Sequence, residues 1–280
     1  NARLGVAGQG IGVAEGAYQH ALAFALERKQ GRTSVDGGTG TIVDHADVRR
    51  MLATMKADVF AARSIALACG VAIDMSNATG DAGWGARAAF LTPIAKAFGT
   101  DTGIAVAETG VQVHGGMGVI EETGAAQYCR DVRVTAIYEG TNGIQAMDLV
   151  GRKMMDGGEA ANRLLDEIEA EIEGARVHFP NMADAVWQSC ETLREATDWM
   201  VAQSDMNARF AGAVPYLRAF ARVLGGHLHL LSAKADKGGP REKLARFYIQ
   251  RLLPEHQGLL AHAQAGDKDL FALTTEELIA

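Results

Sequence analysis

The chain has 280 residues, enough for one large or two smaller domains with a buried core. Its 27 Lys and Arg residues against 34 Asp and Glu residues give a net charge of −7, which argues against non-specific binding to nucleic acid or to an anionic membrane. Three cysteines without a CxxC pair exclude a disulfide framework, and we expect a cytoplasmic protein without a metal site. No apolar run approaches the roughly 20 residues of a membrane span, so none is expected.

The first residues already carry a helical pattern. The chain begins without Met and without a signal-peptide layout, so we expect a piece of a longer protein. Apolar residues at steps of three and four predict a helix from about residue 5 to residue 30, with Arg28 and Lys29 in its last turn. The Gly-, Ser- and Thr-rich residues 33–41 predict a loop.

The next helices follow from the same spacing. A nearly heptad apolar stripe from Leu52 to Ile73 predicts about six turns packed in a bundle, long enough to suggest assembly of two or more chains. A third helix, with several small residues, is predicted over residues 84–113 and must end at the glycine run that starts at Gly115. Shorter helices are predicted over residues 123–129 and 144–155.

A pair of glycines, Gly157 and Gly158, marks a candidate boundary. Beyond it the spacing predicts about four more helices, and Pro254 should kink or split the last of them. We therefore predict an all-α protein, with a four-helix up-down bundle over residues 1–157 and a second helical bundle over residues 158–280. Within the second bundle, His227 and His229 are two positions apart, so their side chains should point away from each other on a helix. We therefore expect a partly buried or surface pair rather than a metal site.

One short segment, Tyr138-Glu139-Gly140-Thr141, does not resemble core sequence. It places a carboxylate between an aromatic residue and a glycine just before a helix. A carboxylate beside apolar groups is suited to accepting a proton, and the free N–H groups of the turn and the helix start can hold an oxygen of a ligand. The residues alone leave a second interpretation open, a capping turn with an exposed glutamate.

A second segment, Gln112 to Gly118, is a glycine-rich turn after a helix. It could admit a phosphate or a nucleotide closely, or it could be a helix cap followed by a tight turn. It is not the dinucleotide-binding fingerprint, because no strand precedes it.

The order and spacing of four motifs resemble the C-terminal part of acyl-CoA dehydrogenases over residues 1–155. The motifs are Glu27-Arg28-Lys29, Gln112-x-x-Gly115-Gly116-x-Gly118, Arg130-Asp131-x-Arg133 and Tyr138-Glu139-Gly140-Thr141. Residues 158–280 resemble the extra C-terminal helical domain of one subgroup, which includes long-chain and 3-methylthiopropanoyl-CoA dehydrogenases.

The resemblance implies an FAD-dependent α,β-dehydrogenation of an acyl-CoA thioester. Glu139 matches the base that removes the α-proton while the β-hydride passes to flavin N5, and Arg3 and Gly140 match positions near the substrate. The residues that match FAD contacts, several of them across a dimer, are Arg28, Gln112, Gly115, Gly116 and Thr141.

The resemblance also implies electron-transfer flavoprotein as the electron acceptor and a homodimer or homotetramer. Two other functions stay open. One is a non-catalytic helical oligomerisation module, which would not require Tyr138-Glu139-Gly140. The other is a DNA-associated relative of the same fold with a basic C-terminal domain. Residues 151–280 hold 15 Lys and Arg against 19 Asp and Glu, which disfavours the DNA-associated relative.

Overall fold

The computed structural model describes residues 2–280, and this part of the chain contains helices and no strand, which confirms the all-α class. The helices are α1 (Ala2–Glu27), α2 (Ala46–Thr79), α3 (Ala82–His114), α4 (Ala125–Arg133), α5 (Asn142–Asp148), α6 (Glu159–Arg176), α7 (Pro180–Ala202), α8 (Met206–Ala211), α9 (Ala213–Ala235), α10 (Pro240–Arg251), α11 (Glu255–Ala263) and α12 (Thr275–Ile279). Short 3-10 turns cover Ile42–Asp44, Gly115–Gly118, Glu121–Thr123 and Val134–Ala136, and a π turn covers Leu149–Lys153.

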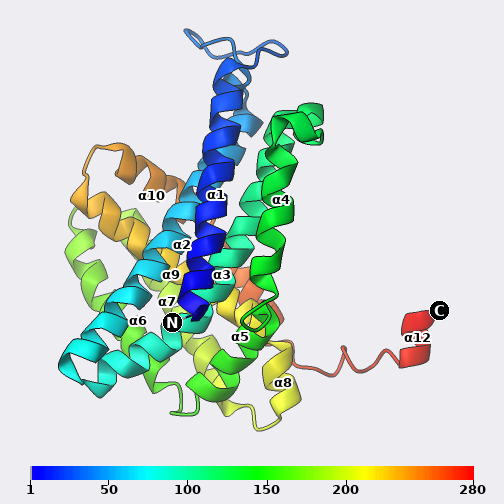
Figure 1. Cartoon of the computed structure of the whole chain (residues 1–280). Helices are drawn as coiled ribbons and strands as arrows, with labels where there is room; N and C mark the ends of the chain where they lie inside the picture. The colour runs from blue at the N-terminus through cyan, green and yellow to red at the C-terminus, as the bar shows by residue number, and fades with distance from the viewer. Residues whose placement is uncertain (1) are drawn as a thin grey trace.

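Helices α1, α2, α3 and α4 run alternately up and down and form the first bundle (Figure 1). The tightest contact in it is between α1 and α3, which meet through glycines. A Cβ on Gly10 would lie 2.8 Å from the carbonyl oxygen of Gly99, and one on Gly103 would lie 2.7 Å from the carbonyl oxygen of Gly10. The small residues of α1 and α3 thus allow a close helix contact.

The second half packs directly on the first. Helix α9 contacts α2 and α3 of the first bundle and α6, α7, α10 and α11 of the second half. One continuous apolar core therefore includes Ile65 and Phe90 from the first half and Leu165 and Phe220 from the second. The boundary between residues 157 and 158 stays a prediction. The split at Pro254 is confirmed, because α10 ends and α11 begins on either side of it; α8 and α12 had no counterpart in the sequence prediction.

The helix predicted over residues 123–129 runs on to Arg133 as α4. Two further predicted helix ends were wrong where a contact from elsewhere in the chain intervenes. Helix α1 ends at Glu27, so Arg28 and Lys29 lie just beyond it, because the chain turns there and the carbonyl of Arg28 accepts a hydrogen bond from Ile42 N–H (2.7 Å). The helix expected over residues 144–155 is α-helical only as far as Asp148. It continues as the π turn, whose Val150 carbonyl accepts a hydrogen bond from Arg209 of α8.

Helix α2 is the one helix in residues 2–280 that is long and apolar enough to cross a membrane by length and composition. It lies instead between α1, α3 and α9 as a core helix. Its Asp58 forms a buried ion pair with Arg222 of α9, and Arg222 also donates to Glu255 of α11 (2.6 Å). This charged contact links the two halves of the chain through their shared core.

Candidate functional site

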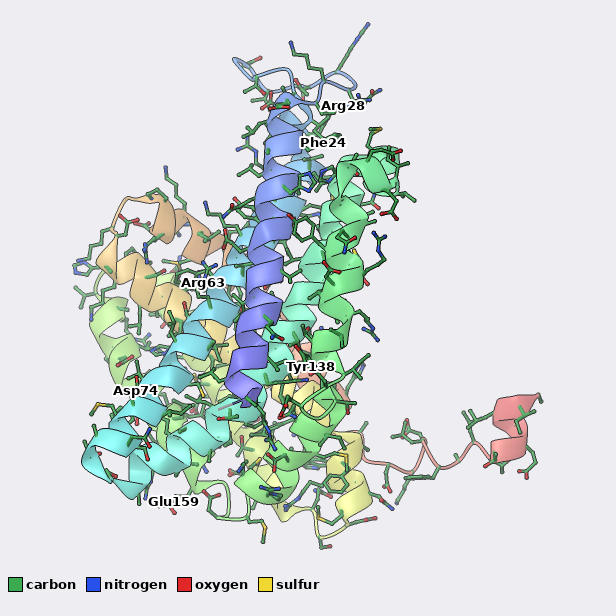
Figure 2. The ribbon with its side chains drawn as sticks, in the orientation of Figure 1. Phe24, Arg28, Arg63, Asp74, Tyr138 and Glu159 are labelled. Atoms are coloured by element: carbon green, nitrogen blue, oxygen red, sulfur yellow. The ribbon has the colours of Figure 1, made fainter. Side chains whose placement is uncertain are left out.

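The segment from Tyr138 to Thr141 lies between α4 and α5, against the N-terminal half of α1. Figure 2 shows Tyr138 beside α1, and its hydroxyl donates a hydrogen bond to Gln9 of that helix. The hydroxyl of Thr141 caps α5 by accepting from Ile144 N–H (3.4 Å). Contacts with two helices therefore hold this turn in place.

Glu139 has an unusual backbone conformation. Its φ is +55°, and among residues 2–280 it is the one non-glycine residue with a positive φ. The next residue, Gly140, has a φ of +87°. A left-handed conformation costs a residue with a Cβ about 1–2 kcal/mol, and such strain is concentrated at functional sites. The sequence did not predict this feature.

The surroundings of Glu139 differ from the expectation. Its side chain is exposed rather than enclosed by apolar groups. The neighbouring Tyr138 is also 38% exposed, so neither flanking residue covers the carboxylate. Within residues 2–280, the Glu139 carboxylate therefore faces solvent. The apolar environment that the sequence predicted for it would have to come from a bound ligand or from another protein surface.

Two buried side chains hold the turn from behind. Gln145 donates from Nε2 to the carbonyl oxygens of Glu139 and Gly140, both at 3.1 Å. Lys96 of α3 donates from Nζ to the carbonyl oxygen of Gly140 (2.9 Å) and to Oδ1 of Asn142 (2.8 Å). Sequence reasoning missed Lys96; the signal was a lone lysine within the apolar stretch Phe90–Phe98.

Arg3 lies at the same end of the bundle, and its place near the substrate stays a prediction. Its Nη1 is 2.7 Å from Oδ2 of Asp148 on α5, and Arg152 contacts the other oxygen of that carboxylate at 2.9 Å. About a third of the Arg3 side chain is exposed. The guanidinium is therefore anchored by an ion pair and still reachable from solvent.

Replacing Glu139 with Gly should stabilise the chain. The change removes the Cβ that strains the left-handed conformation, and after the extra entropy of the unfolded glycine we expect a gain of about 0.5–1 kcal/mol in the free energy of unfolding. Urea denaturation of the two proteins measures this. The matched change Glu108→Gly, on the exposed face of α3, should instead cost about 1 kcal/mol. A loss of stability in both variants would show that Glu139 is unstrained.

A second group of predicted residues gathers at the other end of α1. A surface cleft of about 480 Å³ is lined by residues that include Phe24, Arg28, His114, Gly115 and Gly116. Figure 2 shows Phe24 and Arg28 together at this end of the bundle. Gln112, an exposed residue in the last turn of α3, is not among the lining residues, although its carbonyl accepts from Gly115 N–H.

The cleft offers groups that suit a phosphorylated cofactor with planar rings. It combines the guanidinium of Arg28 with the glycine backbone at Gly115 and Gly116 and with the stacked rings of Phe24 and His114 (centroids 4.4 Å apart). Nδ1 of His114 lies 2.7 Å from the carbonyl oxygen of Gly110, whereas its buried Nε2 has no hydrogen-bond partner within residues 2–280.

The two groups of residues do not form one compact site. Gln9 touches the turn that carries Glu139, and Phe24 lines the cleft. These residues are 15 positions apart on α1, which corresponds to about 22 Å along the helix. Thr141 lies with Glu139, whereas Arg28, Gly115 and Gly116 lie at the distant end.

Each half of the chain matches the model of a known protein family. The model of the acyl-CoA dehydrogenase C-terminal domain matches residues 1–155. The chain belongs to the acyl-CoA dehydrogenase family. A second model, described as acetyl-CoA dehydrogenase C-terminal like, matches residues 164–274.

Among curated relatives of this acyl-CoA dehydrogenase chain, 3-methylmercaptopropionyl-CoA dehydrogenase of Ruegeria pomeroyi is 39% identical over 91% of this chain and 47% of its own length. A butyryl-CoA dehydrogenase of Syntrophomonas wolfei is 30% identical over 92% of this chain and 46% of its own length. The chain therefore spans about half the length of these relatives. An acyl-CoA dehydrogenase of Bacillus anthracis complexed with FAD shares the fold, with a TM-score of 0.74 and 18% identity over 93% of this chain and 48% of that one.

The histidine pair is more deeply buried than the sequence predicted. His227 and His229 are 8% and 0% exposed. They do point apart: Nε2 of His227 is 2.7 Å from Glu171, whereas Nε2 of His229 is 3.1 Å from the carbonyl oxygen of Ala57. Burial lowers the pKa of His229 to about 4, so it is neutral at pH 7. Over residues 2–280, no group of three or more His, Cys, Asp or Glu side chains is arranged to hold a metal ion.

Proposed function

We propose that this chain carries the catalytic base of an FAD-dependent acyl-CoA dehydrogenase, which removes one hydrogen each from the α- and β-carbons of an acyl-CoA thioester. The observation that carries the proposal is the strained, exposed Glu139 within Tyr138-Glu139-Gly140-Thr141. A strained backbone persists only where surrounding contacts hold it, as those from Lys96 and Gln145 do here.

In the proposed mechanism, an oxygen of the Glu139 carboxylate takes the α-proton. A thioester α-proton is far less acidic than a carboxylic acid, so the negative charge that develops on the thioester carbonyl needs hydrogen-bond donors. Among the described residues, the backbone N–H groups of Glu139 and Gly140 have no acceptor, and both are available for that oxygen. FAD, when bound, supplies the acceptor for the hydride that leaves the β-carbon.

We propose that FAD is held by two copies of the chain. Thr141, which lies with Glu139, belongs to the flavin end. Arg28, Gln112, Gly115 and Gly116 lie at the far end of the bundle, where Phe24 is about 22 Å from Gln9 along α1. The resemblance matches the distant group to FAD contacts across a dimer, so we assign that group to FAD bound beside Glu139 of a second copy.

The expected assembly is a homodimer or a homotetramer. The family resemblance and the separation of the two groups of residues support this proposal. Static light scattering on the purified protein at micromolar concentration measures the mass in solution. A monomer at that concentration would contradict the two-copy FAD site.

We propose an acyl-CoA with a short chain as the substrate, electron-transfer flavoprotein as the electron acceptor, and the cytoplasm as the location. The names of the two curated relatives, which specify 3-methylmercaptopropionyl-CoA and butyryl-CoA, support the short chain. The deciding experiment adds each of these thioesters, and a long-chain acyl-CoA as comparison, to a full-length version of the protein that is loaded with FAD, without oxygen. Bleaching of the flavin absorbance by a short thioester supports the proposal, and no bleaching by any thioester contradicts it.

A further inference from the structure

Lys96 is a fully buried lysine in the middle of α3. It is 0% exposed, and its neighbours on the helix include the buried residues Ile94, Ala97 and Phe98. Burying an ammonium group is costly unless it is well hydrogen-bonded. Burial lowers the pKa of Lys96, which shows that its charged form is disfavoured by these surroundings. A lysine retained at such a position needs a specific reason.

The contacts of Lys96 all lead to the turn that carries Glu139. Its two hydrogen-bond acceptors are the neutral oxygens of Gly140 (2.9 Å) and of the Asn142 side chain (2.8 Å), which are one and three residues after Glu139. The two acceptors are more than 40 positions away along the chain from Lys96. The ammonium therefore joins the core of α3 to the catalytic turn.

A polar network balances the buried charge. Asn142 accepts from Lys96 through Oδ1 and donates through Nδ2 to Asp101 (2.6 Å). Thr100 also lies within hydrogen-bond distance of the Asn142 side chain, at 2.9 Å from Nδ2. Burial raises the pKa of Asp101. One amide thus connects a cation and a carboxyl group, both on α3, and fixes the start of α5.

We propose that Lys96 is a positioning residue for the α-proton transfer: by holding the Gly140 carbonyl and Asn142, it keeps Glu139 in its left-handed conformation with the carboxylate presented to the substrate. This inference rests on the proposed role of Glu139 as the base. Lys96 itself does not touch the substrate, because it is fully enclosed behind the turn.

A purely structural lysine and a positioning lysine predict different kinetics. If Lys96 only stabilised the fold, its loss would lower the melting temperature and leave the chemical step unchanged in the protein that remains folded. If it positions Glu139, its loss slows proton transfer while substrate binding is retained, because a misplacement of the order of 1 Å costs about 10²-fold in rate.

The test is Lys96→Met in a full-length version of the protein that is loaded with FAD, with its best acyl-CoA. Methionine keeps the length of the side chain and removes the charge and the donors. We expect kcat to fall about 10²-fold, KM and FAD content to stay near their original values, and the isotope effect on kcat with substrate deuterated at the α-carbon to rise. The control Lys56→Met, at an exposed position on α2, should change none of these quantities.

Asn142→Ala is a second variant if Lys96→Met fails to fold. It removes one of the two acceptors of Lys96, and it should lower kcat and raise the same isotope effect. An unchanged kcat and isotope effect in the folded variants, together with an inactive Glu139→Gln protein, would overturn the positioning role alone. An active Glu139→Gln protein would instead overturn the proposed function.

Discussion

Replacing Glu139 with Gln is expected to lower the rate of dehydrogenation by at least about 10⁴-fold, the upper end of what loss of a general base costs. The amide keeps the shape of the side chain and removes the proton acceptor. Because the β-hydride leaves readily only when negative charge has developed at the α-carbon, loss of the base stops both bond cleavages. The rate of anaerobic flavin bleaching by acyl-CoA, in a full-length version of the protein that is loaded with FAD, measures the effect.

The control for this experiment is Glu108→Gln, which changes an exposed glutamate on α3. It should bleach at the original rate. The flavin content of Glu139→Gln should also equal that of the unmodified protein, since the carboxylate is exposed and does not support the fold. Bleaching of Glu139→Gln at close to the original rate would remove Glu139 from the mechanism and favour a non-catalytic helical module.

The second large effect concerns the 280-residue chain tested by itself. We expect it to fold, to hold FAD weakly or not at all, and to show no turnover. Its proposed contacts lie in two groups about 22 Å apart, one around an exposed turn and one in a surface cleft. Either group alone buries too little of the cofactor to offset the cost of ordering it.

Titration of this chain with FAD, followed by flavin fluorescence, measures the binding. The variant Arg28→Ala serves as a comparison, because it removes the cation from the cleft. Tight, saturable quenching by the unmodified chain, lost in Arg28→Ala and accompanied by activity on an acyl-CoA, would show that these residues are sufficient for the site.

Local patterns were enough to predict the helices other than α8 and α12. The apolar stripe from Leu52 to Ile73, the glycines after α3 and the proline between α10 and α11 each act over a few residues, so their effects can be predicted without knowing the fold. The errors fell where a distant contact changes the local outcome. Arg209 of α8 reaches the turn after α5, and the hydrogen bond between Ile42 and Arg28 lies where α1 ends early.

For the candidate site, too, some features follow from the local sequence and others from the tertiary structure. The motif around Glu139 was recognisable because four residue types occur together in order, and the sequence determined that a carboxylate would precede a helix there. Only the tertiary structure decided that this carboxylate is exposed on a left-handed residue, that Lys96 holds its turn, and that Arg28 lies far from it. These features depend on which parts of α1 and α3 meet the turn and on the length of α1. The contacts of Lys96 with residues more than 40 positions away hold the turn, and no local pattern encodes those contacts.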